Sequence, residues 1–216
     1  MEEKPSVLIV DDNAVNRMVL EAIFVKEGFQ IYSAEDGPGG RSLAQTRSPD
    51  LILLDIMMPG ESGFDTCRIL KRDPTTSDIP IIFVSSLVDV KEKVMGFSLG
   101  AVDYITKPFE RLEILARARL HIKLKKAYTL QIEAQSARLK QLQAAQKAIL
   151  IQPEECPDAG FAVYYKPFHE VGGDFYDVLR GGEDIFDYFV ADISGHDLGA
   201  CLPTSALKAL LINNTG

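Results

Sequence analysis

Short, largely apolar runs recur along the first half of the chain, with helix-like segments between them. The runs are residues 7–10, 30–34, 51–54, 81–84 and 103–106. Four apolar residues in a row, as in residues 51–54, are typical of a strand that is buried on both faces of a parallel sheet. Strands that alternate with helices indicate βαβ units. The pattern therefore predicts an α/β domain with a five-stranded, parallel, doubly wound sheet.

Cap and turn residues predict where the helices between these runs begin and end. Asn13 is a good N-cap for a helix that ends at Gly28, and another helix should follow Ser62. Residues 36–40, with the sequence DGPGG, are interpreted as a loop or a weak helix start. They lack the Lys and the spacing of a phosphate-binding P-loop, so a turn is the better interpretation.

Residues 109–150 contain neither Gly nor Pro and are rich in good helix formers. Such a helix extends on the order of 60 Å, more than a small domain can cover. Within it, one set of positions is spaced alternately four and three residues apart, and this seam comprises Tyr128, Ile132, Gln135, Leu139, Leu142, Gln146 and Ile149. Most of these residues are apolar, which favours a parallel coiled-coil homodimer over a single helix lying on its own domain.

Polar residues stand where four of the predicted strands end. Asp11 and Asp12 follow the first strand, Asp55 the third, Ser85 the fourth and Lys107 the fifth. Open α/β sheets place their chemistry at this edge. Adjacent carboxylates repel each other, so a fold that holds them recruits a cation, most simply Mg²⁺. A single Asp here is more often a helix cap, but the ordered set suits phosphoryl transfer to a carboxylate, with Asp55 as the nucleophile.

With these residues in this order, residues 5–122 resemble the receiver domain of two-component response regulators, which has a flavodoxin-like fold. The resemblance implies that Asp55 accepts a phosphoryl group from a sensor histidine kinase in phosphorelay signalling. It implies Mg²⁺ ligands at Asp11, Asp12, Asp55 and the backbone carbonyl of Met57. Ser85 and Lys107 would contact the phosphoryl group.

The resemblance also gives a role to Tyr104, as the aromatic residue that swings inward on activation. From the residues alone, Tyr104 is equally well interpreted as a half-buried strand aromatic. The family further implies a cis peptide bond between Lys107 and Pro108, whereas an X-Pro bond in general has only a modest tendency to be cis.

Residues 153–160 have the composition of a linker, and a second domain is expected after it. Strands are predicted over residues 161–165, around 174–178 and over 185–193, with a helix over 200–212. Asp174 and Asp192 stand at strand edges near glycines. Carboxylates on neighbouring strands can converge on divalent metals that activate water for phosphoester hydrolysis. Turn Asp residues are common, however, and the spacing leaves both interpretations open.

Residues 171–177 (VGGDFYD) and 191–196 (ADISGH) resemble the start of PPM-type serine/threonine phosphatases, in the bacterial branch that acts on phosphorylated regulators of sigma factors. The resemblance implies Mn²⁺ or Mg²⁺ ligands at Asp174, Asp192 and the Ile193 carbonyl. It implies a phosphorylated anti-sigma-factor antagonist, or a similar phosphoprotein, as substrate. The remaining metal-binding Asp residues of that family lie further on than residue 216. We therefore expect an N-terminal fragment of an α+β phosphatase domain, inactive by itself.

The expected organisation is a receiver domain over residues 1–122, a helical linker over 123–152 and the phosphatase-like segment over 153–216. Phosphorylation of the receiver would control a protein phosphatase output. The alternative is a non-catalytic adaptor whose phosphatase-like domain only binds a partner; the presence of both Asp174 and Asp192 favours the phosphatase. A nucleotide cyclase signature is a poor match, because only one acidic residue follows the paired glycines.

The composition limits which classes of partner and which cellular compartment we expect. The net charge of -8 argues against non-specific binding of nucleic acid, and no basic recognition helix follows the linker. The basic bias of the long helix is best explained as a solvated face. Three widely spaced cysteines fit reduced thiols. With no signal peptide and no apolar stretch near 18 residues, which is roughly what a membrane span needs, we expect a cytoplasmic protein.

Overall fold

The computed structural model describes residues 4–86, 89–166, 174–183, 185–192 and 206–211. The chain divides into two compact units, Met1–Leu130 and Gln131–Gly216. A single helix, α5 (Arg111–Ile149), runs from the first unit into the second. None of the described helices has the length and apolarity that a membrane span requires.

The first unit contains one parallel sheet of five strands. They are β1 (Ser6–Val10), β2 (Gln30–Ala34), β3 (Leu51–Leu54), β4 (Ile81–Ser85) and β5 (Asp103–Thr106), in the spatial order β2-β1-β3-β4-β5. This order is that of a doubly wound, flavodoxin-like sheet. The prediction from the apolar runs is confirmed.

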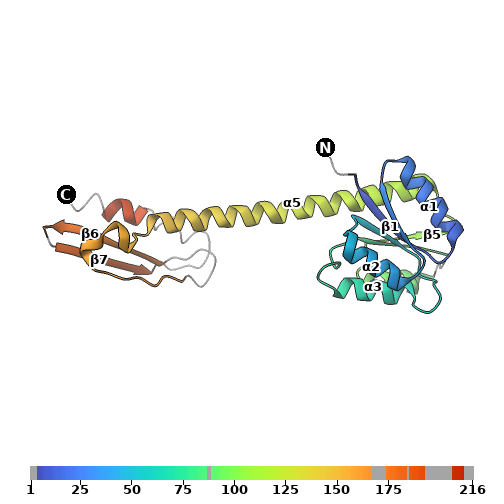
Figure 1. Cartoon of the computed structure of the whole chain (residues 1–216), viewed down its shortest axis with the longest axis horizontal. Helices are drawn as coiled ribbons and strands as arrows, with labels where there is room; N and C mark the ends of the chain where they lie inside the picture. Colours follow the sequence, from blue (N-terminus) through green and yellow to red (C-terminus); the bar gives the residue numbers. More distant parts are fainter. Residues whose placement is uncertain (1–3, 87–88, 167–173, 184, 193–205, 212–216) are drawn as a thin grey trace. The chain divides into compact units, whose positions relative to one another are not determined.

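Side chains of successive strand residues point to opposite faces of the sheet, so the first unit has two apolar cores. On one face, the strands pack against α1 (Ala14–Lys26) and the start of α5, in a cluster that includes Val7, Leu53, Phe24 and Ile114. On the other face, Leu8 and Leu54 pack with Ala44 of α2 (Gly37–Arg47) and with Cys67 and Leu70 of α3 (Gly63–Arg72). Figure 1 shows these helices on the two sides of the sheet. A further helix, α4 (Val90–Ser98), also belongs to this unit.

Of the two interpretations of the glycine-rich segment, a loop or a weak helix start, the helix start is confirmed, because the segment forms the first turn of α2. The Asp36 side chain caps the helix by accepting a hydrogen bond of 2.7 Å from the Gly39 amide. Gly40 then packs on β1, where a Cβ atom would lie only 2.8 Å from a methyl carbon of Val10. The glycines weaken the helix propensity but permit this close approach, and the tertiary packing decides the structure.

The second unit contains an antiparallel pair, β6 (Asp174–Gly182) and β7 (Ile185–Asp192), and the 3-10 turns η1 (Pro153–Glu155) and η2 (Pro157–Ala159). The strand predicted over residues 161–165 is wrong, because these residues form no strand. Tyr165 packs its ring against Tyr176, with 6.0 Å between the centroids, so its apolar character serves side-chain packing alone. Residues 206–211 are helical, within the predicted 200–212. Ile193, His196 and the rest of that predicted helix lie outside the described residues.

The predicted seam of α5 differs in burial along its length. Tyr128 is 67% exposed and Ile132 is 48% exposed, whereas Leu139 and Leu142 are half-buried. Gln146 is only 5% exposed within this one chain. The seam can therefore be open to a partner over its first part, but its end is already covered.

Cys67 and Cys156 are free thiols, as predicted, and Cys201 lies outside the described residues. Cys67 is part of the core, and burial raises the pKa of its thiol to about 11. Its thiol is therefore protonated at neutral pH and should be slow to react in the folded protein.

Gly63, the first residue of α3, lies against the backbone of Asp55, just after β3. A Cβ atom at Gly63 would lie 2.0 Å from the Asp55 carbonyl oxygen and 2.8 Å from the Ile56 Cα. The Gly63 amide also donates a hydrogen bond of 2.9 Å to the Ile56 carbonyl. Because both neighbours are backbone atoms, any larger residue must displace the segment after β3.

We predict that Gly63→Ala lowers the free energy of unfolding by about 1–3 kcal/mol, through overpacking, as measured by urea denaturation. Gly28→Ala is the matched control, since Gly28 has φ +83° and open space around it, so its cost comes from the backbone conformation alone. Unchanged stability in Gly63→Ala would show that α3 can move away from β3 at no cost.

Candidate phosphoacceptor site

Three carboxylates meet at the carboxyl edge of the central strands. Asp11 and Asp12 follow β1 and Asp55 follows β3, and these parallel neighbours pair in register up to Val10 and Leu54. Oxygen atoms of the three carboxylates lie within 4.8 Å of one another. Asp11 and Asp55 are buried, and Asp12 is exposed. A set of hard oxygen donors with one open side fits Mg²⁺, which keeps several waters when it binds to proteins.

Lys107 neutralises part of this negative charge. Its Nζ atom lies 2.7 Å from Asp11 Oδ2 and 2.7 Å from Asp55 Oδ2. Burial lowers the pKa of Lys107, but the hydrogen bonds to the two carboxylates outweigh it and leave the pKa raised. Lys107 precedes a cis peptide bond to Pro108, as the family resemblance implied.

Asp55 combines partial desolvation with two hydrogen bonds. Burial raises the pKa of its carboxyl group above the ordinary value, and the hydrogen bond from Lys107 only partly opposes this. Its Oδ1 atom accepts a hydrogen bond of 3.2 Å from the Met57 amide. The backbone of Met57 thus lies beside Asp55, whereas the Met57 side chain is exposed.

Ser85 and Tyr104 lie on the neighbouring strands β4 and β5. Both are buried, and their side chains share a hydrogen bond. Burial raises the pKa of Tyr104, with the hydrogen bond to Ser85 opposing it. The Nζ atom of Lys93 in α4 lies 5.2 Å from the centre of the Tyr104 ring. Tyr104 therefore lies inward, under α4, rather than at the half-buried position that the strand pattern alone allows.

Two residues of the first turn of α1 hold Asp11, and sequence reasoning did not single them out. The Asn16 amide donates to both carboxylate oxygens of Asp11, at 3.2 Å each, and Arg17 Nη1 donates to the Asp11 carbonyl oxygen at 2.6 Å. Side chains in a helix lean toward its N-terminus, so positions in the first turn reach back to the preceding strand end. That lean is the signal that would have identified them.

Asp174 and Asp192 in the second unit are directly opposite each other, on β6 and β7. Both are exposed. Within the described residues, only Asp11, Asp12 and Asp55 form a group of three or more acidic, His or Cys side chains close enough to share an ion. The carbonyl of Ile193, the third ligand in the phosphatase resemblance, lies outside the described residues.

Comparison with known proteins identifies the first unit. The model of the response regulator receiver domain family matches residues 7–119. The DNA-binding dual master transcriptional regulator RpaA of Synechocystis is 41% identical over 115 residues, which are 53% of this chain and 48% of that protein. The response regulator PleD of Caulobacter vibrioides is 42% identical over 113 residues, or 52% of this chain and 25% of PleD. The chain thus spans half the length, or less, of these curated relatives.

Solved structures of receiver domains also resemble the first unit. A putative response regulator from Chloroflexus aurantiacus superposes with a TM-score of 0.54 at 29% identity, covering 56% of this chain and 99% of that one. The receiver domain of the sensor histidine kinase PA1611 from Pseudomonas aeruginosa, with a magnesium ion coordinated in its active site cleft, superposes with a TM-score of 0.53 at 26% identity, covering 56% and 99%. The chain belongs to the response regulator receiver family and carries a receiver domain of two-component signalling.

Proposed function

We propose that Asp55 accepts a phosphoryl group from a sensor histidine kinase and that this phosphorylation controls a protein serine/threonine phosphatase output of the second unit. The observation that carries the first half is the convergence of Lys107 with the carboxylates of Asp11 and Asp55 at one strand edge. Support for the second half comes from the residues of β6 and β7.

In the proposed transfer, a carboxylate oxygen of Asp55 attacks the phosphorus of a phosphohistidine as the P–N bond breaks. The leaving imidazole takes the electron pair and picks up a proton from solvent. Lys107 and Ser85 contact phosphoryl oxygens, and Lys107 already lies within hydrogen-bond distance of the nucleophile. Mg²⁺ held by Asp11, Asp12, Asp55 and the Met57 carbonyl would neutralise further phosphoryl oxygens.

The exposed side of α1 offers the kinase a surface next to the site. Val15, Met18 and Val25 are exposed apolar residues at helical spacing, and α1 begins directly after the acidic pair. Apolar residues in such a row are suited to packing against a helix of a partner. A kinase helix seated there would bring its phosphohistidine close to Asp55.

We predict that Asp55→Asn abolishes Mg²⁺-dependent labelling by radioactive acetyl phosphate, because the amide cannot form an acyl phosphate while its shape is retained. Labelling of the protein is followed by gel autoradiography. Asp78→Asn is the control, since Asp78 is exposed and lies at the opposite edge of the sheet, just before β4. Labelling that survives in Asp55→Asn would refute the assignment of the acceptor.

The opposed carboxylates of β6 and β7 support a metal site. Like charges directly opposite each other on neighbouring strands destabilise a sheet. Burial raises the pKa of Tyr165, and the nearby Asp174 charge adds to this rise. A divalent cation between Asp174 and Asp192 would remove the repulsion and could activate water for phosphoester hydrolysis.

We predict that the natural-length protein hydrolyses a phosphoserine substrate in the presence of Mn²⁺, at a rate that changes when Asp55 is phosphorylated. Asp192→Ala should reduce this hydrolysis to background, because it removes a metal ligand. Asp187→Ala, at another exposed position of β7, is the control and should retain it. Metal-dependent hydrolysis absent under every condition would favour the adaptor, and the search would turn to what the second unit binds.

Exposed apolar residues of α5 support a homodimer through the linker helix. Tyr128 and Ile132 of the seam are exposed, and Leu120 and Leu124, on the adjacent face toward the start of the helix, are exposed as well. Because Gln146 is buried within its own chain, the dimer contact is confined to the earlier positions.

We predict that Tyr128→Lys with Ile132→Lys halves the molar mass measured by light scattering, because charges at the seam repel their symmetry mates. Both side chains are exposed within one chain, so the fold should persist. Thr129→Lys with Ser136→Lys, off the seam on the same helix, should leave the mass unchanged. A parent protein that is already monomeric would rule out this contact.

A further inference from the structure

One amine joins three elements of the second unit. Lys208, in the helical residues 206–211, places its Nζ atom 3.6 Å from Asp177 Oδ2 on β6. The same amine donates a hydrogen bond of 2.6 Å to the carbonyl oxygen of Ile149, the last residue of α5. The end of α5 and the strand β6 are therefore linked through Lys208.

The Asp177 carboxylate and the Ile149 carbonyl are both stabilised by a nearby cation. Asp177 is 2% exposed, and its Oδ2 atom accepts no hydrogen bond from the described residues, while Oδ1 accepts one of 2.9 Å from the Val178 amide. A buried carboxylate is tolerated only when it is paired. The last carbonyls of a helix lack intrahelical partners and carry partial negative charge, which favours a cation beside them. Lys208 supplies a cation to both, at ion-pair distance from Asp177 and at hydrogen-bond distance from the Ile149 carbonyl.

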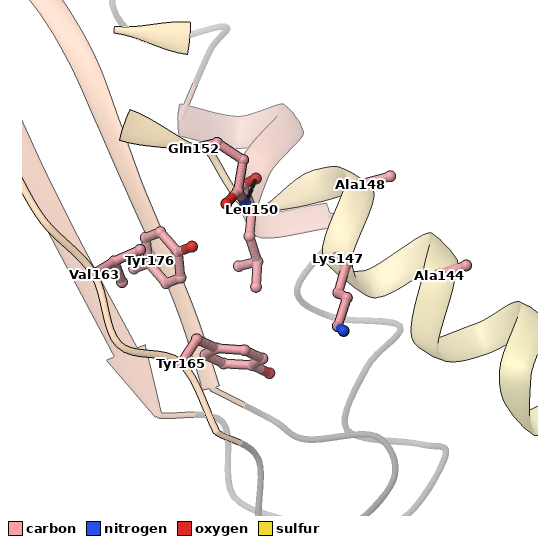
Figure 2. Close-up of a pocket in the computed structure, with 8 residues that line it drawn as sticks. All are labelled: Ala144, Lys147, Ala148, Leu150, Gln152, Val163, Tyr165 and Tyr176. Atoms are coloured by element: carbon pink, nitrogen blue, oxygen red, sulfur yellow. Dashed lines mark hydrogen bonds between the residues drawn. The ribbon is translucent and has the colours of Figure 1, made fainter. Parts of the chain in front are cut away.

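A cleft lies beside the end of α5. Leu150 is buried, and Figure 2 shows it extending from the end of α5 toward Tyr165 and Tyr176. The same residues line a cleft of about 580 Å³ together with Lys147 and Gln152. The end of α5 thus faces β6 through the apolar side chain of Leu150 and is linked to it through Lys208.

We propose that the Lys208–Asp177 pair is the joint through which a displacement of α5 reaches β6 and the proposed metal ligand Asp174. Asp174 lies three residues before Asp177 on the same strand, so their side chains point to opposite faces: Asp177 inward and Asp174 outward. Lys208 and Asp177 are positioning residues, since neither is a ligand of the proposed site. Control by phosphorylation through this joint rests on the proposed function, but the joint itself does not.

Amide hydrogen exchange of the 216-residue chain tests the joint. Lys208→Met should speed exchange about tenfold or more both at the end of α5, residues 144–150, and in β6, residues 174–180. Lys140→Met, at an exposed position of α5, is the control and should change neither. Asp177→Leu combined with Lys208→Met should be closer to the parent than Lys208→Met alone, because no buried charge is then left unpaired. A change confined to residues 206–211 would overturn the joint.

A second comparison separates transmission from a merely structural role. Ala145 is exposed in the last turns of α5, and Ala145→Gly should loosen the helix there, with exchange about fivefold faster. In the parent background, exchange in β6 should rise with it; in the Lys208→Met background, Ala145→Gly should leave β6 unaffected. Equal effects on β6 in both backgrounds, or none in either, would overturn the proposal.

Phosphorylation with acetyl phosphate and Mg²⁺ then tests whether the receiver controls the second unit through this joint. A change of exchange in β6 that depends on Asp55 and is lost in Lys208→Met supports the joint as the route of control. If Ala145→Gly reaches β6 through Lys208 but phosphorylation does not, the joint stands and the proposed control of the second unit by the receiver fails.

Discussion

The receiver depends on how the charge of three clustered carboxylates is balanced. Asp11 and Asp55 are buried, Asp12 is close to both, and such groups repel each other strongly where water is scarce. Lys107 lies between Asp11 and Asp55 at hydrogen-bond distance, reaching them from β5, two strands away from β3. The sheet order is therefore a condition of the site, because it alone brings a cation from the last strand to the acids of the first and third.

That dependence explains why so much of the first unit could be predicted from the sequence. A parallel strand buried on both faces leaves an uninterrupted apolar run, and its carboxyl end is where polar chemistry must stand, so residues 51–55 carry both signals at once. Asn16 and Gly63 are neither part of an apolar run nor located at the carboxyl end of a strand. Asn16 reaches Asp11 because helical side chains point toward the helix N-terminus, and Gly63 is required because α3 packs directly against the backbone of Asp55. Both depend on tertiary approach, which a one-dimensional pattern does not record. The same reason explains why the sequence left a loop and a helix start open at α2, where packing on Val10 outweighs a weak helix propensity.

In the second unit, the hydrophobic pattern predicted a strand that the structure does not have. Residues 161–165 have the aromatic and β-branched composition of a strand but form none, because that composition reports a half-buried surface rather than backbone pairing. In β6, Phe175 and Val178 are buried, whereas Ile185 and Val190 of the paired strand are exposed. A two-stranded sheet is marginal by itself. The positions of Asp174 and Asp192 at strand edges made a metal site one of two open interpretations, and only the resemblance favoured it and added the Ile193 carbonyl.

The seam of helix α5 has different surroundings at different positions. Counting back from Tyr128 in steps of three and four reaches Lys125, His121, Ala118 and Ile114. Ile114 and Ala118 are buried in the receiver core, and His121 lies 3.1 Å from Asp103 of β5. Counting forward reaches Gln146, which is buried in the second unit. Between these two covered ends, Tyr128 and Ile132 are exposed, so the periodicity alone does not say which positions are covered or by what. Residues on one face of a helix that runs through two units can thus pack on a different surface in each unit. Periodicity records only that these residues share a face of the helix.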